Sequence, residues 1–512
     1  MVAPTFSARR RREPEDFSRM DEAFVSHSGL SDAVTRAVKA GTLRKLASRV
    51  YTRNLTDVPE DIVRRNLWSL VGGLLPGALV ADRTALENRP AADGSVFVVA
   101  DHKRDLVLPG VTLRPRKGAP PLPSDRPFIA GLHIASLPRA FLENMRSSRA
   151  RSGVARTLPK AEIEARLETE LRVGGEPALQ RIRDEARAIS QELGLTEEYA
   201  RLNGLISALL GSSDVPLEAP TAVARASGAP YDPFCVELFQ VLHAHLASTA
   251  PSVRPASPTP GAVLPFFEAY FSNFIEGTEF EVDEAADIVF RGHIPSDRPA
   301  DAHDILGTWK IVSDDAEMSR TPKSIEELKV LLVGRHARIM EGRPEKGPGR
   351  FKTQSNRAGS TVFVAHELVD GTLAKGFEFY RSLTAPLHRA AFMMFLVAET
   401  HPFADGNGRV ARVMMNAELV AAGESRIVVP TVYRNNYLNA LPALSHNKVP
   451  DALLLVLDFA QRYTRAIDFS TLETARHGLE QTNAFIPANE ADDAGKRLVM
   501  PTPELLAGRR EG

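Results

Sequence analysis

The twelve residues HPFADGNGRVAR, from His401 to Arg412, contain several groups that could act on a polyphosphate. Because a residue before proline is pushed out of helical geometry, His401 is expected at the end of the apolar helix that precedes it. The unperturbed pKa of an imidazole lies near neutrality, as a general base requires. The carboxylate of Asp405 is a hard oxygen ligand that suits Mg²⁺ held between one carboxylate and substrate phosphates. These types and this spacing predict a nucleotide-handling site.

Residues 409–423 are expected to form an amphipathic helix that closes at Gly423, with Gly406, Asn407 and Gly408 at its entry. Unpaired N–H groups and the positive end of the dipole make such a helix start an anion site, and glycines let a phosphate approach closely. Two arginines three positions apart can reach the same edge and hold further phosphates. Singly, a histidine is more often a cap, DGNG a turn and an arginine pair solvated surface. Their combination favours a binding site.

The stretch matches His-x-Phe-x-(Asp/Glu)-Gly-Asn-Gly-Arg-x-x-Arg at every fixed position, and therefore resembles the signature of Fic domains. The resemblance covers roughly residues 263–470. It implies a helical core with a β-hairpin flap, and transfer of AMP from ATP to a Ser, Thr or Tyr hydroxyl of a target protein. In this scheme His401 deprotonates the hydroxyl, Phe403 anchors the loop and Asp405 holds Mg²⁺. The phosphates are held by Gly406, Asn407, Gly408, Arg409 and Arg412.

Two further segments resemble parts of the same family. GRFK (residues 349–352) and STVFVAH (residues 360–366) resemble the segments before and within the flap, where Val364, Ala365 and His366 would line the nucleotide. An ordinary edge hairpin remains an equal alternative, and ELVDGTL replaces the usual Pro-rich continuation that follows. YRNNYLNAL (residues 433–441) matches the region that borders the adenine. Asn436 and Tyr437 stand there, where members often have paired tyrosines.

FSNFIEGTEF contains Ser272 and Glu276 four positions apart, followed by Gly277. The plain interpretation is a helix that ends in Glu-Gly. The spacing also matches (Ser/Thr)-x-x-x-Glu-(Gly/Asn), the inhibitory motif of Fic proteins. The resemblance implies that Glu276 pairs with Arg412 and takes the place of the γ-phosphate. In some members this glutamate orients water that removes AMP from a modified target, so deAMPylation at the same site is an alternative activity.

Basic residues gather near the N-terminus of a chain whose formal net charge is only −1. Residues 28–53 predict a short helix, a break at Gly41 and a β-hairpin, with Asp32 as the single acid. A solvated helix face explains this patch, but it is also the footprint of phosphate-backbone binding. Together with ALVADRTALE and HIASLPRAFLENM, the segment resembles the winged-helix region of AbiE-type antitoxins and regulators. That implies a recognition helix over residues 32–40, a wing that includes RVYTR, and duplex-DNA contacts by Arg36, Lys39 and Arg44.

The whole chain, 512 residues long, is expected to be a mainly α protein with several domains. The predicted parts are a winged-helix module (22–115), a helical middle region (127–247), a Pro/Ser-rich linker at the main boundary (248–262), the Fic domain (263–470) and a flexible tail (489–512).

A single cysteine, Cys235, suits a reducing cytoplasm, and the longest apolar run, residues 390–398, is too short to span a membrane. A homodimer is left open. A rival function is a DNA-binding transcriptional regulator whose Fic domain only senses nucleotide.

Overall fold

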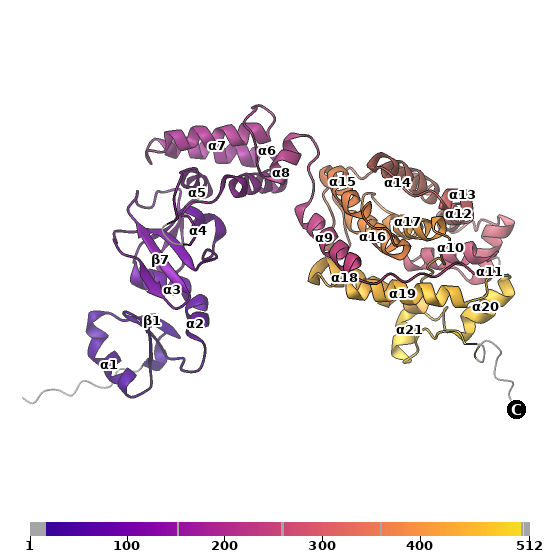
Figure 1. The fold of residues 1–512 in the computed structure, drawn as a ribbon, viewed down its shortest axis with the longest axis horizontal. Helices are drawn as coiled ribbons and strands as arrows, with labels where there is room; N and C mark the ends of the chain where they lie inside the picture. Colours follow the sequence, from indigo (N-terminus) through magenta and orange to yellow (C-terminus); the bar gives the residue numbers. More distant parts are fainter. Residues whose placement is uncertain (1–16, 151–152, 258–260, 359–360, 503–504, 506–512) are drawn as a thin grey trace, which may run out of the picture. The chain divides into compact units, whose positions relative to one another are not determined.

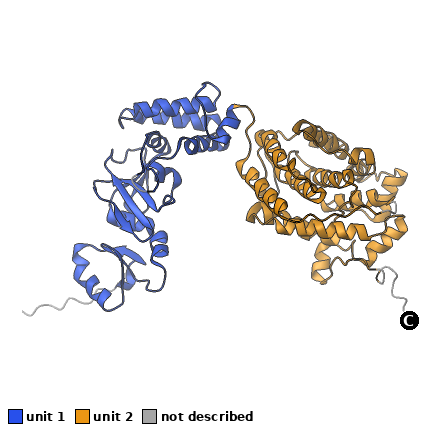
Figure 2. Cartoon of the chain, in the orientation of Figure 1, with its two compact units in different colours: residues 1–226 blue, residues 227–512 orange. Residues whose placement is uncertain are grey.

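The computed structural model describes residues 17–150, 153–257, 261–358, 361–502 and 505. The chain divides into two compact units, residues 1–226 and residues 227–512 (Figures 1 and 2). Helices dominate both the second unit and the later part of the first. The predicted mainly α class is therefore confirmed, with sheets confined chiefly to the first 134 residues.

The first unit begins with a small sheet packed against a helix. The strands run antiparallel in the order β1-β3-β2, and Gly41, with φ of 71°, reverses the chain between helix and hairpin. Leu30, Val34 and Leu43 bury the apolar side of the helix. The predicted helix, break and hairpin are thus confirmed as local structure. The elements are β1 (Ala23–Val25), α1 (Ser31–Lys39), β2 (Arg44–Ala47), β3 (Val50–Thr52), α2 (Pro59–Arg65) and α3 (Leu67–Leu74).

A six-stranded mixed sheet follows, in the order β6-β7-β5-β4-β9-β8. Its strands are β4 (Leu79–Val80), β5 (Ser95–Val99), β6 (Leu106–Leu108), β7 (Val111–Arg116), β8 (Arg126–Pro127) and β9 (His133–Ile134). Because β9 pairs with β4, the expected limit between residues 115 and 127 falls inside one sheet and is wrong. The helices of this unit are α4 (Asp82–Glu87), α5 (Leu137–Asn144), α6 (Lys160–Ser190), α7 (Thr196–Leu209) and α8 (Pro220–Ala226).

The main boundary lies after Ala226, not in the Pro-rich segment 248–262 that the composition favoured. Helix α9 (Pro233–Ser248) explains the difference, because its apolar face is buried in the core of the second unit. Phe239 of this helix packs against Phe392 and Phe395. The described part of the Pro-rich segment also pairs with this unit, since the Ser425 N–H donates to the Arg254 carbonyl. Prolines here mark an ordered connection within a domain.

Two central helices form the core of the second unit, α16 (Pro386–Thr400) and α17 (Asn407–Ala421) (Figure 1). The run AAFMMFLVA is the middle of α16, where apolar packing on every side accounts for the unbroken hydrophobic sequence. Around them lie α10 (Leu264–Ile275), α11 (Val282–Ala286), α12 (Pro299–Val312), α13 (Asp315–Met318), α14 (Ile325–Ile339), α15 (Val369–Tyr380), α18 (Arg434–Asn447) and α19 (Asp451–Ala466). A two-stranded hairpin, β10 (Arg357–Ala358) and β11 (Thr361–Val362), occupies the predicted flap.

The packed unit continues beyond residue 470, where the Fic domain was expected to end. Helix α20 (Leu472–Gln481) buries Ala475 and Leu479 in an aromatic cluster that contains Phe267. Helix α21 (Ala488–Asp493) buries Ala491, so the beginning of the expected tail is helical. Among the described residues, no helix combines the length and apolarity that a membrane crossing needs.

Candidate nucleotide site at the start of helix α17

His401 lies directly after α16 in the left-handed region, with φ of 52° and ψ of 58°. Its Nδ1 is 3.1 Å from the carbonyl oxygen of Ala398, and because a carbonyl can only accept, Nδ1 carries the proton. The other ring nitrogen, Nε2, therefore keeps its lone pair. Burial, assisted by the charge of Lys352, lowers the pKa of His401 to about 4. The imidazole is neutral at pH 7 and can accept a proton.

The flap contributes an aromatic ring that fixes the orientation of His401. Phe363 stacks flat on the imidazole, with ring centroids 3.6 Å apart and planes 6° from parallel. This residue was not among the predicted flap contacts, although alternation along STVFVAH puts it on the same face as Thr361. The contact joins the hairpin directly to the candidate base.

The loop between the two central helices is held by hydrogen bonds to its own backbone. The Asn407 side chain accepts from the Phe403 N–H and donates to the Phe403 carbonyl, both at 2.9 Å. Asn356 donates to the same carbonyl at 3.0 Å. Gly406, with φ of 74°, makes the sharp turn that starts α17. The buried Phe403 anchors this loop, and the helix begins two residues before the first predicted position, Arg409.

Asp405 is the carboxylate nearest this helix start in sequence. Its Oδ1 accepts from the Gly406 N–H at 2.7 Å, and its side chain is 43% exposed. Oδ2 has Lys346 Nζ at 3.9 Å, a distance that leaves it open to another ligand. No group of three or more His, Cys, Asp and Glu side chains suited to a metal ion occurs within the described residues. One outward carboxylate oxygen fits an ion whose other ligands come from phosphates and water.

Glu276 reaches into the anion position at the start of α17. Its Oε1 is 2.7 Å from Arg412 Nη2, and a Cβ added to Gly408 would collide with this same oxygen. Arg412 also donates from Nε to the Ser272 hydroxyl at 3.0 Å and from Nη2 to the Ser272 carbonyl at 2.8 Å. Gly277, with φ of 87°, continues the chain past the helix end. A carboxylate of the protein thus stands where the glycine-lined backbone is open to an anion.

The contact between α10 and α17 extends beyond this pair. Glu268 and Ser272 on α10 and Glu276, the residue that caps its C-terminal end, lie four residues apart. They face Asn416, Arg412 and Gly408, which are also four apart on α17. Asn416 donates to Glu268 at 2.8 Å. Helix α10 is therefore held to α17 along two turns.

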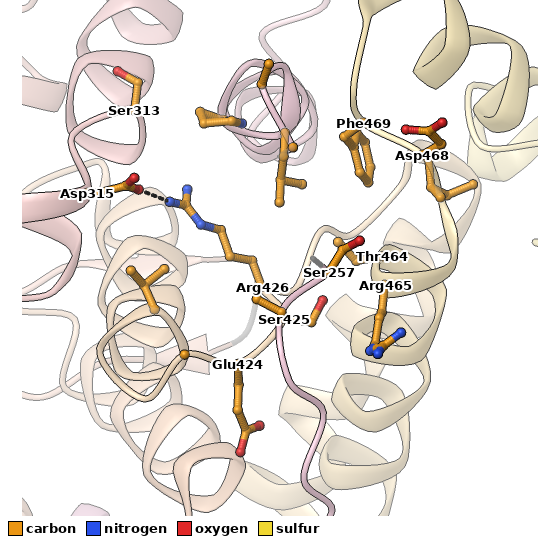
Figure 3. A pocket seen from close by; sticks show the side chains of 18 of the residues that line it. Ser257, Ser313, Asp315, Glu424, Ser425, Arg426, Thr464, Arg465, Asp468 and Phe469 are labelled. Carbon is orange, nitrogen blue, oxygen red and sulfur yellow. Dashed lines mark hydrogen bonds and ion pairs between the residues drawn. The ribbon is translucent and has the colours of Figure 1, made fainter. Parts of the chain in front are cut away.

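Arg426 secures the other end of α10. It donates to Glu268 at 2.8 Å and pairs with Asp315 at 3.1 Å, a contact drawn in Figure 3. Arg426 and Asp315 border a cavity of about 910 Å³ whose lining includes Gly423, beyond the end of α17. A helix of fifteen residues separates this cavity from the loop at His401, so it is distinct from the candidate site.

Arg409 does not share the surroundings of Arg412, although the spacing predicted one common edge. Its Nη1 is 2.6 Å from Asp304 Oδ2, and both side chains are buried. Asn273 accepts from the same nitrogen at 3.4 Å. The charge of Arg409 is neutralised inside the protein, where it holds α10 and α12 to α17. Asp304 lies 105 positions earlier in the chain, and no local pattern marks it.

The predicted flap and adenine contacts are divided between core and surface. Val364 is 4% exposed and belongs to the hydrophobic core of the second unit, and Ala365 packs against that core. His366 begins a short 3-10 turn and lies 3.1 Å from Glu367. Tyr437 is buried with its ring 5.9 Å from the Arg412 guanidinium, whereas Asn436, next to it on α18, is exposed.

Arg434, on the same helix, donates to the Ile275 carbonyl at 3.0 Å and so caps the last turn of α10. No motif in the sequence marks Arg434 for this role, for which a cationic residue near a helix C-terminus is the general signal.

In the N-terminal unit the three predicted DNA-contacting residues differ in exposure. Arg36 and Lys39 are exposed on the last turn of α1. Arg44 is half-buried and donates to the Asp57 carbonyl at 3.2 Å. Two of the three therefore face solvent from one helix.

The second unit is thus a helical domain whose central helix start can hold an anion beside a neutral imidazole. Residues 328–419 match the sequence model of the Fic/DOC family. The chain contains a Fic/DOC domain, as the motif predicted.

Sequence relatives bear the same family name. The chain is 24% identical over 241 residues to "Protein adenylyltransferase Fic" of Nematostella vectensis, covering 45% of this chain and 55% of the relative. It is 29% identical over 127 residues to the protein of that name in Drosophila yakuba, covering 25% and 24%. The matches span between about a quarter and about half of these relatives.

Among solved structures, Fic-1 of C. elegans aligns at 17% identity with a TM-score of 0.33, covering 59% of this chain and 93% of that one. A Fic domain containing signaling protein from Bacteroides thetaiotaomicron aligns at 17% identity with a TM-score of 0.35, covering 47% and 97%.

Proposed function

We propose that the protein is an adenylyltransferase, which transfers AMP from ATP to a Ser, Thr or Tyr hydroxyl of a target protein and is held back by Glu276. One observation carries this proposal. A neutral imidazole with a free Nε2, His401, stands beside a glycine-lined helix start within a complete Fic motif. The names of the sequence relatives support the same chemistry.

The reaction needs one proton acceptor and an anion site. His401 Nε2 takes the proton of the target hydroxyl, and the oxygen attacks the α-phosphorus as the bond to the β-phosphate oxygen breaks. AMP becomes esterified to the target and pyrophosphate leaves. The N–H groups at the start of α17 face the phosphates, and Arg412, once released by Glu276, balances their charge. The protein supplies position and charge compensation, as expected for phosphoryl chemistry.

Asp405 is the residue that would hold Mg²⁺, through the carboxylate oxygen that points away from Gly406. Bound there, the ion would neutralise phosphate charge. Asp405 itself is oriented by the Gly406 N–H, which leaves one oxygen for this purpose.

The engaged Glu276 keeps ATP from binding productively. Its carboxylate covers Gly408 and takes a donor of Arg412, so a γ-phosphate would meet a like charge and lack its ligand. The same position could orient water for removal of AMP, and deAMPylation therefore remains the alternative activity of this site.

The test separates transfer from binding. Glu276→Gly protein, incubated with labelled ATP and lysate, should label protein bands and itself. Adding His401→Ala should abolish labelling in protein that still folds cooperatively, because the variant lacks the base. Equal labelling in the double variant would contradict the mechanism.

We further propose that the N-terminal module binds duplex DNA. Arg36 and Lys39 are exposed on α1, next to a hairpin, in a segment with one acid. This arrangement favours contact with a phosphate backbone. A protein with both activities could regulate transcription, the rival function, without losing the transferase. The catalytic motif is intact, which a pure nucleotide sensor would not need.

A further inference from the structure

His336, on α14, packs against the loop that joins α16 to α17 and lies outside the motif of residues 401–412. The side chain is fully buried, and its ring stacks on Phe403 with centroids 3.7 Å apart and planes 3° from parallel. Its Nδ1 accepts from the Gly349 N–H at 2.9 Å. Since a backbone N–H can only donate, the ring proton is on Nε2, which donates to the Asp405 carbonyl at 3.1 Å.

Each part of this imidazole therefore contacts a different part of the site. One face supports the Phe403 anchor, one nitrogen holds Gly349 before the flap, and the other holds Asp405. A phenylalanine would supply the stack but neither hydrogen bond. The use of both nitrogens on backbone atoms from two segments is more than core packing requires.

We infer that His336 is a positioning residue that sets the direction of the Asp405 carboxylate, an inference that rests on the proposed function. The Asp405 backbone is fixed on one side by the His336 Nε2–H. Its carboxylate is fixed on the other by the N–H of Gly406. Without the first bond, the peptide after Asp405 can rotate, and the carboxylate oxygen facing outward turns with it. The expected defect is in the use of Mg²⁺ with ATP.

Loss of this donor should affect the Mg²⁺ midpoint of AMP transfer but not the rate at saturating Mg²⁺. Removing the donor should raise the Mg²⁺ concentration for half-maximal AMP transfer by about tenfold or more, the loss typical when a group that orients a metal-binding carboxylate is removed. Saturating Mg²⁺ should recover most of the rate, because His401 and Arg412 do not contact His336. A residue needed only for packing would lower the amount of active protein and leave the Mg²⁺ midpoint unchanged.

The experiment uses the full chain with Glu276→Gly as the parent. His336→Phe keeps the stack and removes both hydrogen bonds, whereas His336→Gln keeps an N–H donor near Nε2 and removes the stack. The matched control is His388→Phe, another buried histidine, on α16. AMP transfer is measured against Mg²⁺ concentration. The Mg²⁺ dependence of the rise in thermal unfolding temperature caused by ATP gives a second midpoint that requires no turnover.

We expect a raised Mg²⁺ midpoint for His336→Phe, a smaller rise for His336→Gln, and the parent's midpoint for His388→Phe. An unchanged midpoint for folded His336→Phe would overturn the inference. If that variant does not fold, His336→Leu decides, because it also removes both hydrogen bonds: a midpoint raised by about tenfold supports the donor role, and one near the parent's overturns it. A parent without any AMP transfer would instead refute the proposed function.

Discussion

Replacing Glu276 with glycine should release the site, and the structure sets a lower bound on the gain. The carboxylate makes one charge-assisted hydrogen bond to Arg412, at 2.7 Å. Such bonds contribute about 1.5–3 kcal/mol, and we take about 1.5–2 because the Glu276 side chain is 31% exposed and partly screened. At about 1.4 kcal/mol per factor of ten, AMP transfer should rise by roughly 10- to 30-fold. Relief of the carboxylate over Gly408 adds to this.

The assay is incorporation of label from α-labelled ATP, at several ATP concentrations. Glu279→Gly is the matched control, an exposed glutamate three residues further along the chain. Adding Arg412→Ala to Glu276→Gly should cancel most of the gain, since the freed guanidinium is what the γ-phosphate needs, and the two changes should be strongly non-additive. A double variant as active as the single one would refute the pairing. An unchanged rate in Glu276→Gly would mean that residues 272–277 only end a helix and do not restrain AMP transfer.

Three further outcomes are expected. Asp405→Ala should remove Mg²⁺-dependent transfer, and activity that survives excess EDTA would contradict its role. The His401 ring should stay neutral as pH falls to about 4, because its folded pKa is lowered from 6.5; a ring resonance, assigned by its loss in His401→Ala, that titrates near 6.5 would contradict this. Full-length protein should bind duplex DNA with affinity that falls steeply as salt rises. Exchanging Arg36 and Lys39 for alanine should weaken binding while Arg64→Ala does not, and failure to retain the protein's own promoter region at low salt would favour a protein-interaction role.

Local sequence patterns were sufficient to predict much of the structure. The residues from His401 to Arg412 are contiguous, so proline geometry, glycines and helix periodicity place them without knowledge of the rest of the fold. The helix, Gly41 break and hairpin near the N-terminus were predicted on similar grounds. The four-residue spacing of Ser272 and Glu276 also placed both on the face that meets Arg412.

The predictions that failed concern residues whose contact partners lie far away in the sequence. Arg409 pairs with Asp304, so its charge is directed inward rather than to the open edge. Proline content suggested a boundary at residues 248–262, but the burial of α9 decides where the unit begins. Phe363 and His336 were missed because a stacked ring and a backbone-bound imidazole look like ordinary core residues in sequence.

The central claim is that AMP, rather than phosphate, moves from ATP to a protein hydroxyl. Glu276→Gly protein should be given ATP labelled at the α-phosphate in one reaction and at the γ-phosphate in another, with the same lysate. We expect protein-bound label from the α-position, none from the γ-position, and loss of the α-label when His401→Ala is added. Label from the γ-position would show phosphorylation and contradict AMP transfer, as would no label from either position in a folded protein that binds ATP.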